Sequence, residues 1–292
     1  MRISLFLAFC SALFSQQSVP PVLSPEVHSD RSVTFRFRAP GAREVILSRE
    51  GAQRVPMTKG DNGVWTLTTD PLDPDYYGYS FVTDGVSMMD PNNPLMKPNL
   101  LNPQSMVHVR GANTRDVRPN VAKGTLHRHF YHSGIIGDDR DFFGYTPPGY
   151  DSKASKPYPV LYLLHGFSDD ASGWTSVGQA HTILDNLIAD GKAKPMLIVM
   201  TLGYGVPEYV ARPSGNRDPA MRERSFQRFR DALFQEVIPD VEKNYRASKN
   251  SKDRAIAGLS MGGGESLFIG LNATERFSWI GAFSSGGSGS DA

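Results

Sequence analysis

The sequence predicts a small all-β sandwich followed by an α/β region built on a parallel sheet. Short segments of alternating apolar and polar residues, separated by regular turns, fill residues 22–110. From about residue 123 onward, continuous apolar runs alternate with segments of helical spacing. A serine flanked by glycines, in Gly258-Leu-Ser-Met-Gly262, stands between such a strand and such a helix.

The composition of the 292-residue chain is that of an ordinary globular protein. Hydrophobic residues make up 39% and charged residues 21%, which argues against disorder. The net charge of +1 indicates neither nucleic acid nor an acidic membrane surface as a partner. No apolar run is long enough to span a bilayer, so no membrane partner is expected.

The N-terminus has the pattern of a secretory signal peptide. Arg2 precedes an apolar run over residues 3–14, and small and polar residues follow. We predict a signal peptide over residues 1–17 and a secreted or periplasmic protein. A buried N-terminal helix or strand is the alternative, which Pro20-Pro21 disfavours. The only cysteine, Cys10, lies in this segment, so the mature chain would have no disulfide and no thiol nucleophile.

The sandwich is predicted over residues 20–110. Its strands are expected at 33–38, 44–48, 64–68 and 76–82. The region resembles the early-set, glycogen-binding-type sandwich in Pro40-Gly41, Gly63-Val-Trp65, Tyr76-Tyr-Gly-Tyr-Ser-Phe81, Asp84-Gly85 and Asp90-Pro91. The resemblance makes Trp65 and Tyr77 candidates for stacking on sugar rings. The alternative is that both belong to the core or to an interdomain contact.

A polar segment, residues 111–122, is predicted to link the sandwich to an α/β domain over residues 123–292. We expect a strand at 125–132, whose histidines His127, His129 and His132 fit a solvated strand face better than a metal site, so no metal is expected. A long loop at 203–220 is expected to shape the substrate pocket. The other elements expected are a buried strand at 160–164, a helix at 180–189, a strand at 196–201, a long helix at 226–241 bent at Pro239, and a last strand at 279–284.

The glycine-flanked serine has the G-x-S-x-G pattern of a nucleophile elbow, in its required strand–turn–helix context. Ser260 is therefore the predicted nucleophile. The backbone N–H of Met261, at the start of the helix, is placed to stabilise an oxyanion. Phe167, which follows His165-Gly166 after the strand at 160–164, offers a second such N–H. His165 is expected to support this loop rather than to act as a base, and Trp174 either lines the pocket or fills space.

Four segments, taken in order, resemble one family. They are Tyr145-Thr-Pro-Pro-Gly-Tyr150, Pro159-Val-Leu-Tyr-Leu-Leu-His-Gly166, Ile238-Pro-Asp-Val-Glu-Lys-Asn-Tyr-Arg246 and Ala257-Gly-Leu-Ser-Met-Gly-Gly263. The α/β-hydrolase group that they resemble holds esterase D, feruloyl and acetyl-xylan esterases of carbohydrate esterase family one, mycolyltransferases and enterochelin esterases. The resemblance covers residues 123–285 and implies an α/β-hydrolase fold, Ser260 as the nucleophile and no cofactor.

The sequence departs from this family after the serine. The family places its catalytic acid and histidine after the nucleophile, but all seven histidines of this chain precede Ser260. Asp291 comes too early and on a terminal tail, and Glu265 and Glu275 fall on or near the next helix. We therefore expect a truncated chain, incomplete at the C-terminal edge of the sheet, whose last strand is a bare edge. Such a chain would be nearly inert.

The resulting hypothesis is a secreted serine carboxylic ester hydrolase acting on feruloyl or acetyl esters of plant cell-wall polysaccharide. Its partner would be a small-molecule or polysaccharide ester, and the sequence says nothing of its oligomeric state. An enterochelin-type ester hydrolase and an acyltransferase of the same fold are alternatives. An alternative of another class is a glycan-binding protein with an inactive hydrolase domain.

Overall fold

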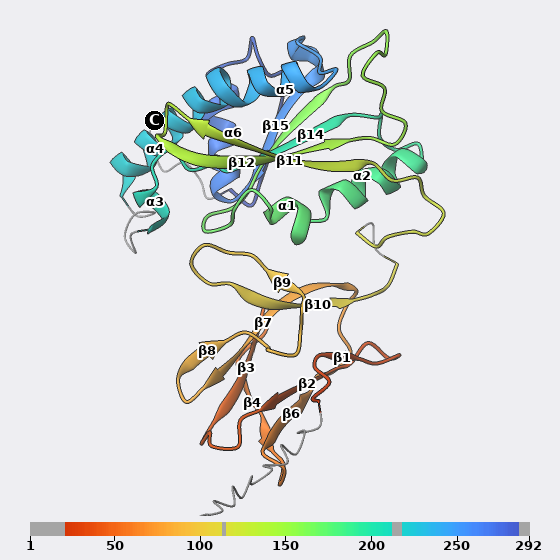
Figure 1. The fold of residues 1–292 in the computed structure, drawn as a ribbon, viewed down its shortest axis with the longest axis vertical. Coiled ribbons are helices and arrows are strands. Elements are labelled where there is room, and N and C mark those ends of the chain that lie inside the picture. Colours follow the sequence, from red (N-terminus) through yellow and green to blue (C-terminus); the bar gives the residue numbers. More distant parts are fainter. Residues whose placement is uncertain (1–20, 113–114, 212–217, 286–292) are drawn as a thin grey trace, which may run out of the picture.

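The computed structural model describes residues 21–112, 115–211 and 218–285. The predicted signal peptide and Asp291 lie outside the described residues. The chain forms a β-rich N-terminal region and, after it, a six-stranded sheet with helices on both faces (Figure 1). The division into a sandwich domain (20–110), a linker (111–122) and a hydrolase domain (123–292) stays a prediction.

The N-terminal region consists of two antiparallel sheets. One has the strand order β1-β2-β6-β5, and the other has the order β4-β3-β7-β10-β9, with β8 paired to β7. The strands are β1 (Glu26–Val27), β2 (Val33–Arg38), β3 (Val45–Arg49), β4 (Val55–Pro56), β5 (Thr58–Lys59), β6 (Val64–Thr68), β7 (Asp75–Thr83), β8 (Val86–Met88), β9 (Met96–Lys97) and β10 (Gln104–Val109). Alternating residues of β2 and β7 meet between the sheets, where the rings of Phe35 and Tyr79 pack edge to face with centroids 4.7 Å apart.

The two aromatic residues proposed to bind sugar are held by the sandwich itself. Trp65 is only 6% exposed, and its indole N–H donates to the Ala39 carbonyl at 2.9 Å. Tyr77 is half-buried, with the Arg49 guanidinium 4.9 Å from its ring centroid and its hydroxyl donating to the Asp73 carbonyl. A sugar ring needs an open aromatic face, so this geometry favours the alternative that both are packing residues.

The second region is ordered around a sheet with the strand order β11-β12-β14-β13-β15-β16. Its elements are β11 (Thr125–Ser133), β12 (Asp138–Thr146), β13 (Val160–Leu164), α1 (Gly173–Ser176), α2 (Ala180–Ala189), β14 (Leu197–Thr201), α3 (Glu208–Ala211), α4 (Pro219–Ala232), a π-helical turn (Leu233–Val237), α5 (Ile238–Asn244), a 3₁₀ turn (Ser251–Asp253), β15 (Arg254–Leu259), α6 (Met261–Leu271) and β16 (Trp279–Phe283).

The sheet is mixed, which corrects the expectation of a parallel one. Strands β14, β13, β15 and β16 are parallel to one another, but β11 and β12 form an antiparallel pair and β12 runs antiparallel to β14. Strand β12 was not predicted because it begins with four charged residues, Asp138-Asp-Arg-Asp141, which lack the apolar pattern of a strand.

Alternate residues of the central strands supply two separate cores. On one face, Val160, Tyr162 and Leu164 of β13 pack with apolar residues from α4, α5 and α6. On the other face, Leu163 packs with Ala180 and Leu184 of α2. Figure 1 shows α2 and α5 on opposite sides of the sheet. Among the described residues, no helix has the length and apolar character needed to cross a membrane.

The long helix predicted at 226–241 forms, and it contains a π-helical turn just before Pro239, where a bend was expected. The π-helical turn at residues 233–237 separates α4 from α5, and Pro239 falls in the first turn of α5. Pro239 has no backbone N–H to donate to the preceding turn, and a proline ring crowds the carbonyl of that turn. The wider turn thus accommodates the proline while Leu233 and Val237 stay buried against the sheet.

Candidate active site

Ser260 lies on the sharp turn between β15 and α6, and its backbone is strained. Its φ and ψ are 53° and −108°, in the positive-φ region that non-glycine residues rarely adopt. The turn is fixed on both sides: the Ser260 N–H donates to the Phe283 carbonyl at 2.8 Å, and its carbonyl accepts from the Gly264 N–H at 3.0 Å. The residue is exposed, so its hydroxyl is accessible above the sheet.

Two glycines make this turn sterically feasible. A Cβ at Gly258 would lie 2.3 Å from the Gly262 carbonyl oxygen, inside the helix start. A Cβ at Gly262 would lie 2.5 Å from the His165 carbonyl oxygen and 2.7 Å from that of Leu164. A side chain at Gly258 would force the start of α6 away from β15, and one at Gly262 would force it away from the end of β13, as the sequence pattern predicted.

The two predicted oxyanion donors lie at the same edge of the sheet. Leu164, the last residue of β13, pairs in register with Gly258 of β15, so Phe167 and Met261 follow the carboxyl ends of adjacent parallel strands. Met261 begins α6, where backbone N–H groups have no intrahelical acceptor. Within the described part of the chain, neither the Phe167 N–H nor the Met261 N–H donates to another protein group.

His165 is built into the loop and is not available as a general base. It is 3% exposed, its Nδ1–H donates to the Gly166 carbonyl at 2.8 Å, and its Nε2 accepts from the Gly203 N–H at 2.9 Å. Burial lowers the pKa of His165 to about 4, even though the hydrogen bond to Gly166 acts to raise it. The neutral ring therefore joins the loop after β13 to the loop after β14.

A family model described as "Putative esterase" matches residues 133–289, more than half of the chain. The chain belongs to this esterase family. A curated endo-1,4-beta-xylanase/feruloyl esterase from Xylanibacter ruminicola is 33% identical over 269 residues, which cover 90% of this chain but 36% of that protein. The chain thus spans little more than a third of the length of this relative.

Solved structures share the fold. A ferulic acid esterase of the CE1 class from Anaeromyces mucronatus, in complex with ferulic acid, is 27% identical and superposes with a TM-score of 0.55, covering 62% of this chain and 66% of that one. The enterobactin esterase from Shigella flexneri, at 18% identity, has a TM-score of 0.62 and covers 89% of this chain and 73% of that one; it shows the fold alone. These likenesses confirm the predicted α/β-hydrolase fold with its preceding β-rich region.

The family resemblance implies an acid and a base after Ser260 in chain order, and the described residues supply neither at Ser260. Within those residues, the Ser260 side chain makes no hydrogen bond to a histidine or a carboxylate. Glu275 is exposed beside Arg276, and Glu265 is buried in α6. Trp174 packs against the core under β13 and donates its indole N–H to the Leu164 carbonyl at 2.8 Å. This contact suits a space-filling role, and substrate binding by Trp174 stays a prediction.

Glu265 is a feature whose burial the sequence did not reveal. It lies in α6, is 0% exposed, and neither carboxyl oxygen has a hydrogen-bond partner among the described residues. A Cβ at Gly203 would lie 2.9 Å from Oε2, so this glycine makes room for the carboxyl group. Burial raises the pKa of Glu265 well above its usual range, against an opposing attraction from Arg140. Burial therefore favours the protonated, neutral form of this carboxyl group.

Arg140 and Tyr204 also fix the loops of the site. No local sequence motif indicates this role for either residue. The Arg140 side chain is buried, and its guanidinium donates to the Asp138 carboxylate and to the carbonyls of Leu202 and Tyr204. These bonds hold the start of the loop after β14. The Tyr204 hydroxyl in turn donates to the Asp169 carbonyl at 3.1 Å, in the loop that carries Phe167.

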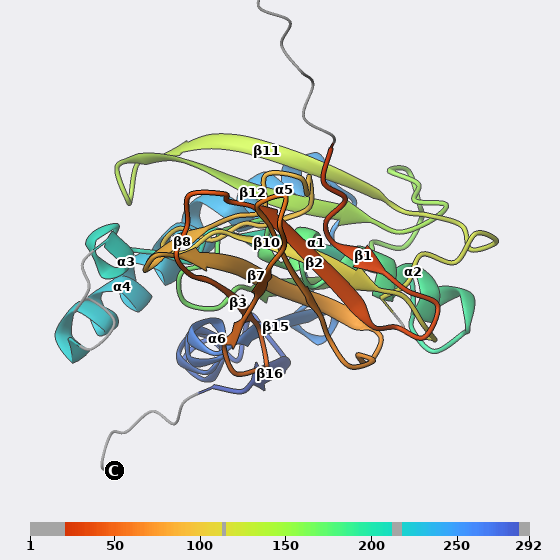
Figure 2. The ribbon, with the colours of Figure 1, turned by 90° about the horizontal axis from the view of Figure 1, so that it is seen from below.

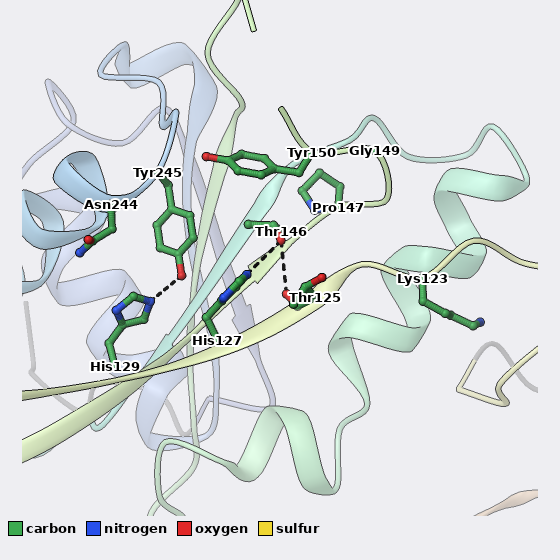
Figure 3. Close-up of a pocket in the computed structure, with 10 residues that line it drawn as sticks. All are labelled: Lys123, Thr125, His127, His129, Thr146, Pro147, Gly149, Tyr150, Asn244 and Tyr245. Atoms are coloured by element: carbon green, nitrogen blue, oxygen red, sulfur yellow. Dashed lines mark hydrogen bonds between the residues drawn. The ribbon is translucent and has the colours of Figure 1, made fainter. Parts of the chain in front are cut away.

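A cavity of about 520 Å³ lies elsewhere, beside β11 (Figure 3). It contains His127, whose Nε2 is 3.3 Å from the Thr146 hydroxyl, and His129, whose Nε2 is 2.5 Å from the Tyr245 hydroxyl. Thr146 ends β12, which runs antiparallel to β14, so this cavity lies at the sheet edge opposite to Ser260. His132, an odd number of residues further along β11, instead contacts Asp139. Among the described residues, no group of three or more His, Cys, Asp or Glu is arranged to hold a metal.

The neutral state of His165 predicts a dependence of stability on pH. Because the folded pKa is below the unfolded value of 6.5, unfolding takes up a proton between these values. The contribution is complete above pH 6.5, is lost as the pH falls toward 4, and amounts to about 3 kcal/mol. Unfolding free energies measured in urea from pH 7 to pH 4 should therefore fall more for the wild type than for His165→Gln. The exposed His132→Gln variant is the control, and equal slopes for wild type and His165→Gln would contradict the prediction.

Glu265 predicts the opposite dependence. Its folded pKa is raised, so above about pH 4.5 the unfolded carboxyl ionises while the folded one stays protonated, and stability falls as the pH rises. Glu265→Gln removes this penalty and should be more stable than the wild type at pH 7, by about 1.4 kcal/mol for each pKa unit involved. The gain should vanish near pH 4. Glu275→Gln, an exposed change, should show no such gain. A less stable Glu265→Gln variant at pH 7 would mean that the buried carboxylate is ionised.

Proposed function

We propose that the protein is a serine carboxylic ester hydrolase. The observation that carries the proposal is an exposed serine on a strained strand-to-helix turn. At the same sheet edge lie the N–H groups of Met261 and Phe167, which have no acceptor among the described residues. Membership of the esterase family supports it. The α6 start also contributes the positive end of its helix dipole to this edge, which favours a developing negative charge.

The chemistry follows from this geometry. The Ser260 hydroxyl oxygen attacks the ester carbonyl carbon, and the carbonyl oxygen becomes an oxyanion that accepts hydrogen bonds from Met261 and Phe167. Collapse of the tetrahedral intermediate expels the alcohol and leaves an acyl group on the serine. Water then attacks the acyl-enzyme and releases the acid. The family resemblance places the histidine and acid that move the protons after Ser260 in chain order, and no such pair contacts Ser260 in the described residues.

The proposed substrate class is feruloyl or acetyl esters of plant cell-wall polysaccharide. Of these two esters, the feruloyl ester has the stronger support. It comes from the similarity to the xylanase/feruloyl esterase of Xylanibacter ruminicola and to the ferulic acid complex of the Anaeromyces mucronatus enzyme. Export is part of the proposal, because a polysaccharide substrate lies outside the cell and residues 1–17 have the pattern of a signal peptide. The burial of Trp65 and the covered face of Tyr77 offer no support for the alternative of a glycan-binding protein.

The test is hydrolysis of methyl ferulate by the complete gene product, because the described residues supply no histidine or acid at Ser260. Ser260→Ala should lower kcat by about a million-fold, because removing the nucleophile of a serine hydrolase such as subtilisin costs about that much. Ser278, an exposed serine just before β16 at the opposite sheet edge, provides the control: Ser278→Ala should hydrolyse the ester at the wild-type rate. Equal activity of the Ser260→Ala variant would rule out the proposed nucleophile.

A further inference from the structure

The loop between β9 and β10 of the sandwich contacts the loop that carries Phe167. The Asn99 side-chain amide donates to the Ser168 hydroxyl at 2.9 Å and to the Asp169 carboxylate at 3.1 Å. The next residue, Leu100, donates its backbone N–H to the Ser168 carbonyl at 2.7 Å. The sandwich therefore binds the residue directly after Phe167 through both its side chain and its backbone. Figure 1 shows β9 at the end of the sandwich that faces the α/β region, and Figure 2 gives the view from the sandwich side.

Ser168 is a residue of this loop whose backbone conformation needs stabilisation by its surroundings. Its φ is 67°, in the left-handed region that is unfavourable for a serine. Such conformations persist only where the surroundings over-determine them. The two bonds from Asn99 and Leu100 fall on Ser168 itself, so they stabilise the strained conformation directly.

Hydrogen bonds within the sandwich loop orient the Asn99 side chain. Its side-chain carbonyl oxygen, Oδ1, accepts from the backbone N–H groups of Leu101 at 3.1 Å and of Asn102 at 2.9 Å. The side-chain NH₂ group is therefore left to point out of this loop. The strand before it is anchored to the sandwich, because the Lys97 ammonium contacts the Glu50 carboxylate at 2.9 Å. Both the donor and its support thus belong to the sandwich.

The far side of the same loop is fixed by the α/β region. Tyr204 donates to the Asp169 carbonyl, and His165 donates to the Gly166 carbonyl. The backbone before Phe167 is therefore held by the α/β region, and the backbone after it is held by both regions of the chain. Removing the Asn99 contacts would let Ser168 return to a negative φ and would turn the preceding backbone, including the Phe167 N–H.

We propose that Asn99, together with the Leu100 N–H, is a positioning element of the oxyanion hole, so that the sandwich completes the esterase site. Asn99 touches neither the substrate nor the reacting atoms; it acts through Ser168 on the direction of the Phe167 N–H. This inference rests on the proposed function, because it assigns the sandwich a role in that same reaction.

The experiment compares Asn99→Ala with Asn102→Ala in the full-length protein. Asn102 is exposed in the same loop, and its side chain makes no hydrogen bond to another described residue, so it is a matched control. We expect Asn99→Ala to lower kcat on methyl ferulate about 10- to 100-fold, below the cost of deleting an oxyanion donor outright, with KM changed less than about twofold. A purely structural loss would instead lower the amount of active protein and the melting temperature together.

A second readout does not depend on activity. The Asp169 N–H donates to the Gly166 carbonyl at 3.2 Å, so its hydrogen exchange reports whether the turn around Phe167 is formed. Exchange in a peptide spanning residues 163–172 should rise about tenfold or more in Asn99→Ala and stay at the wild-type rate in Asn102→Ala. In a double-mutant cycle, Ser168→Ala should add little to the effect of Asn99→Ala, because both changes remove the same contact.

The outcomes separate the two proposals. Faster exchange with a lower kcat in Asn99→Ala supports the positioning role, and unchanged exchange or an unchanged kcat overturns it. If the wild-type protein and Ser260→Ala are equally inactive on esters, the proposed function fails. In that case the exchange data alone decide whether Asn99 orders the loop, and an unchanged exchange rate overturns that as well.

Discussion

The site depends on the close approach of α6 to the end of β13. Gly262 lies against the carbonyls of Leu164 and His165, where even one added carbon atom would overlap the backbone. This contact forces the chain to turn within one residue, so Ser260 takes its strained conformation with positive φ and becomes exposed. The strain is supported from below, because Ile256 of β15 and Ile269 of α6 are fully buried in the same core.

Local sequence patterns were enough to predict the part of the fold around this contact. The apolar run at 160–164 and the helical spacing at 180–189 have the bounds found for β13 and α2. The strand–turn–helix around Ser260 also follows from local pattern, because glycines at these spacings leave few other structures. Fold class was thus predictable from periodicity, since strands and helices that bury one or both faces carry that requirement in their own residues.

The residues that hold the loops of the site were not predictable in this way. Arg140 starts a strand as one of four charged residues, and its buried guanidinium is satisfied by carbonyls more than sixty residues away in sequence. Asn99 likewise finds its partners across the interface between the two regions. A similar limit applies to Trp65, because an aromatic residue in a strand has the same local pattern whether it faces sugar or core. Long-range partners decide these roles, and one sequence does not list them.

Burial favours the neutral forms of two ionisable groups near the site, and the proposed chemistry gives this a reason. His165 must be neutral to accept from Gly203 while it donates to Gly166, so protonation would break one of the bonds that join the two loops. Glu265 lies one turn into the helix whose first N–H faces the predicted oxyanion. An ionised carboxylate there would act against that negative charge in a medium of low dielectric constant, where the repulsion is weakly screened. Burial with no hydrogen-bond partner among the described residues raises the pKa of Glu265 and favours its protonated form, at a cost in stability that rises with pH. The apolar packing that fixes α6 against β13 thus also removes a negative charge from the neighbourhood of Ser260. The electrostatic potential there is then set by the backbone N–H groups and the helix dipole.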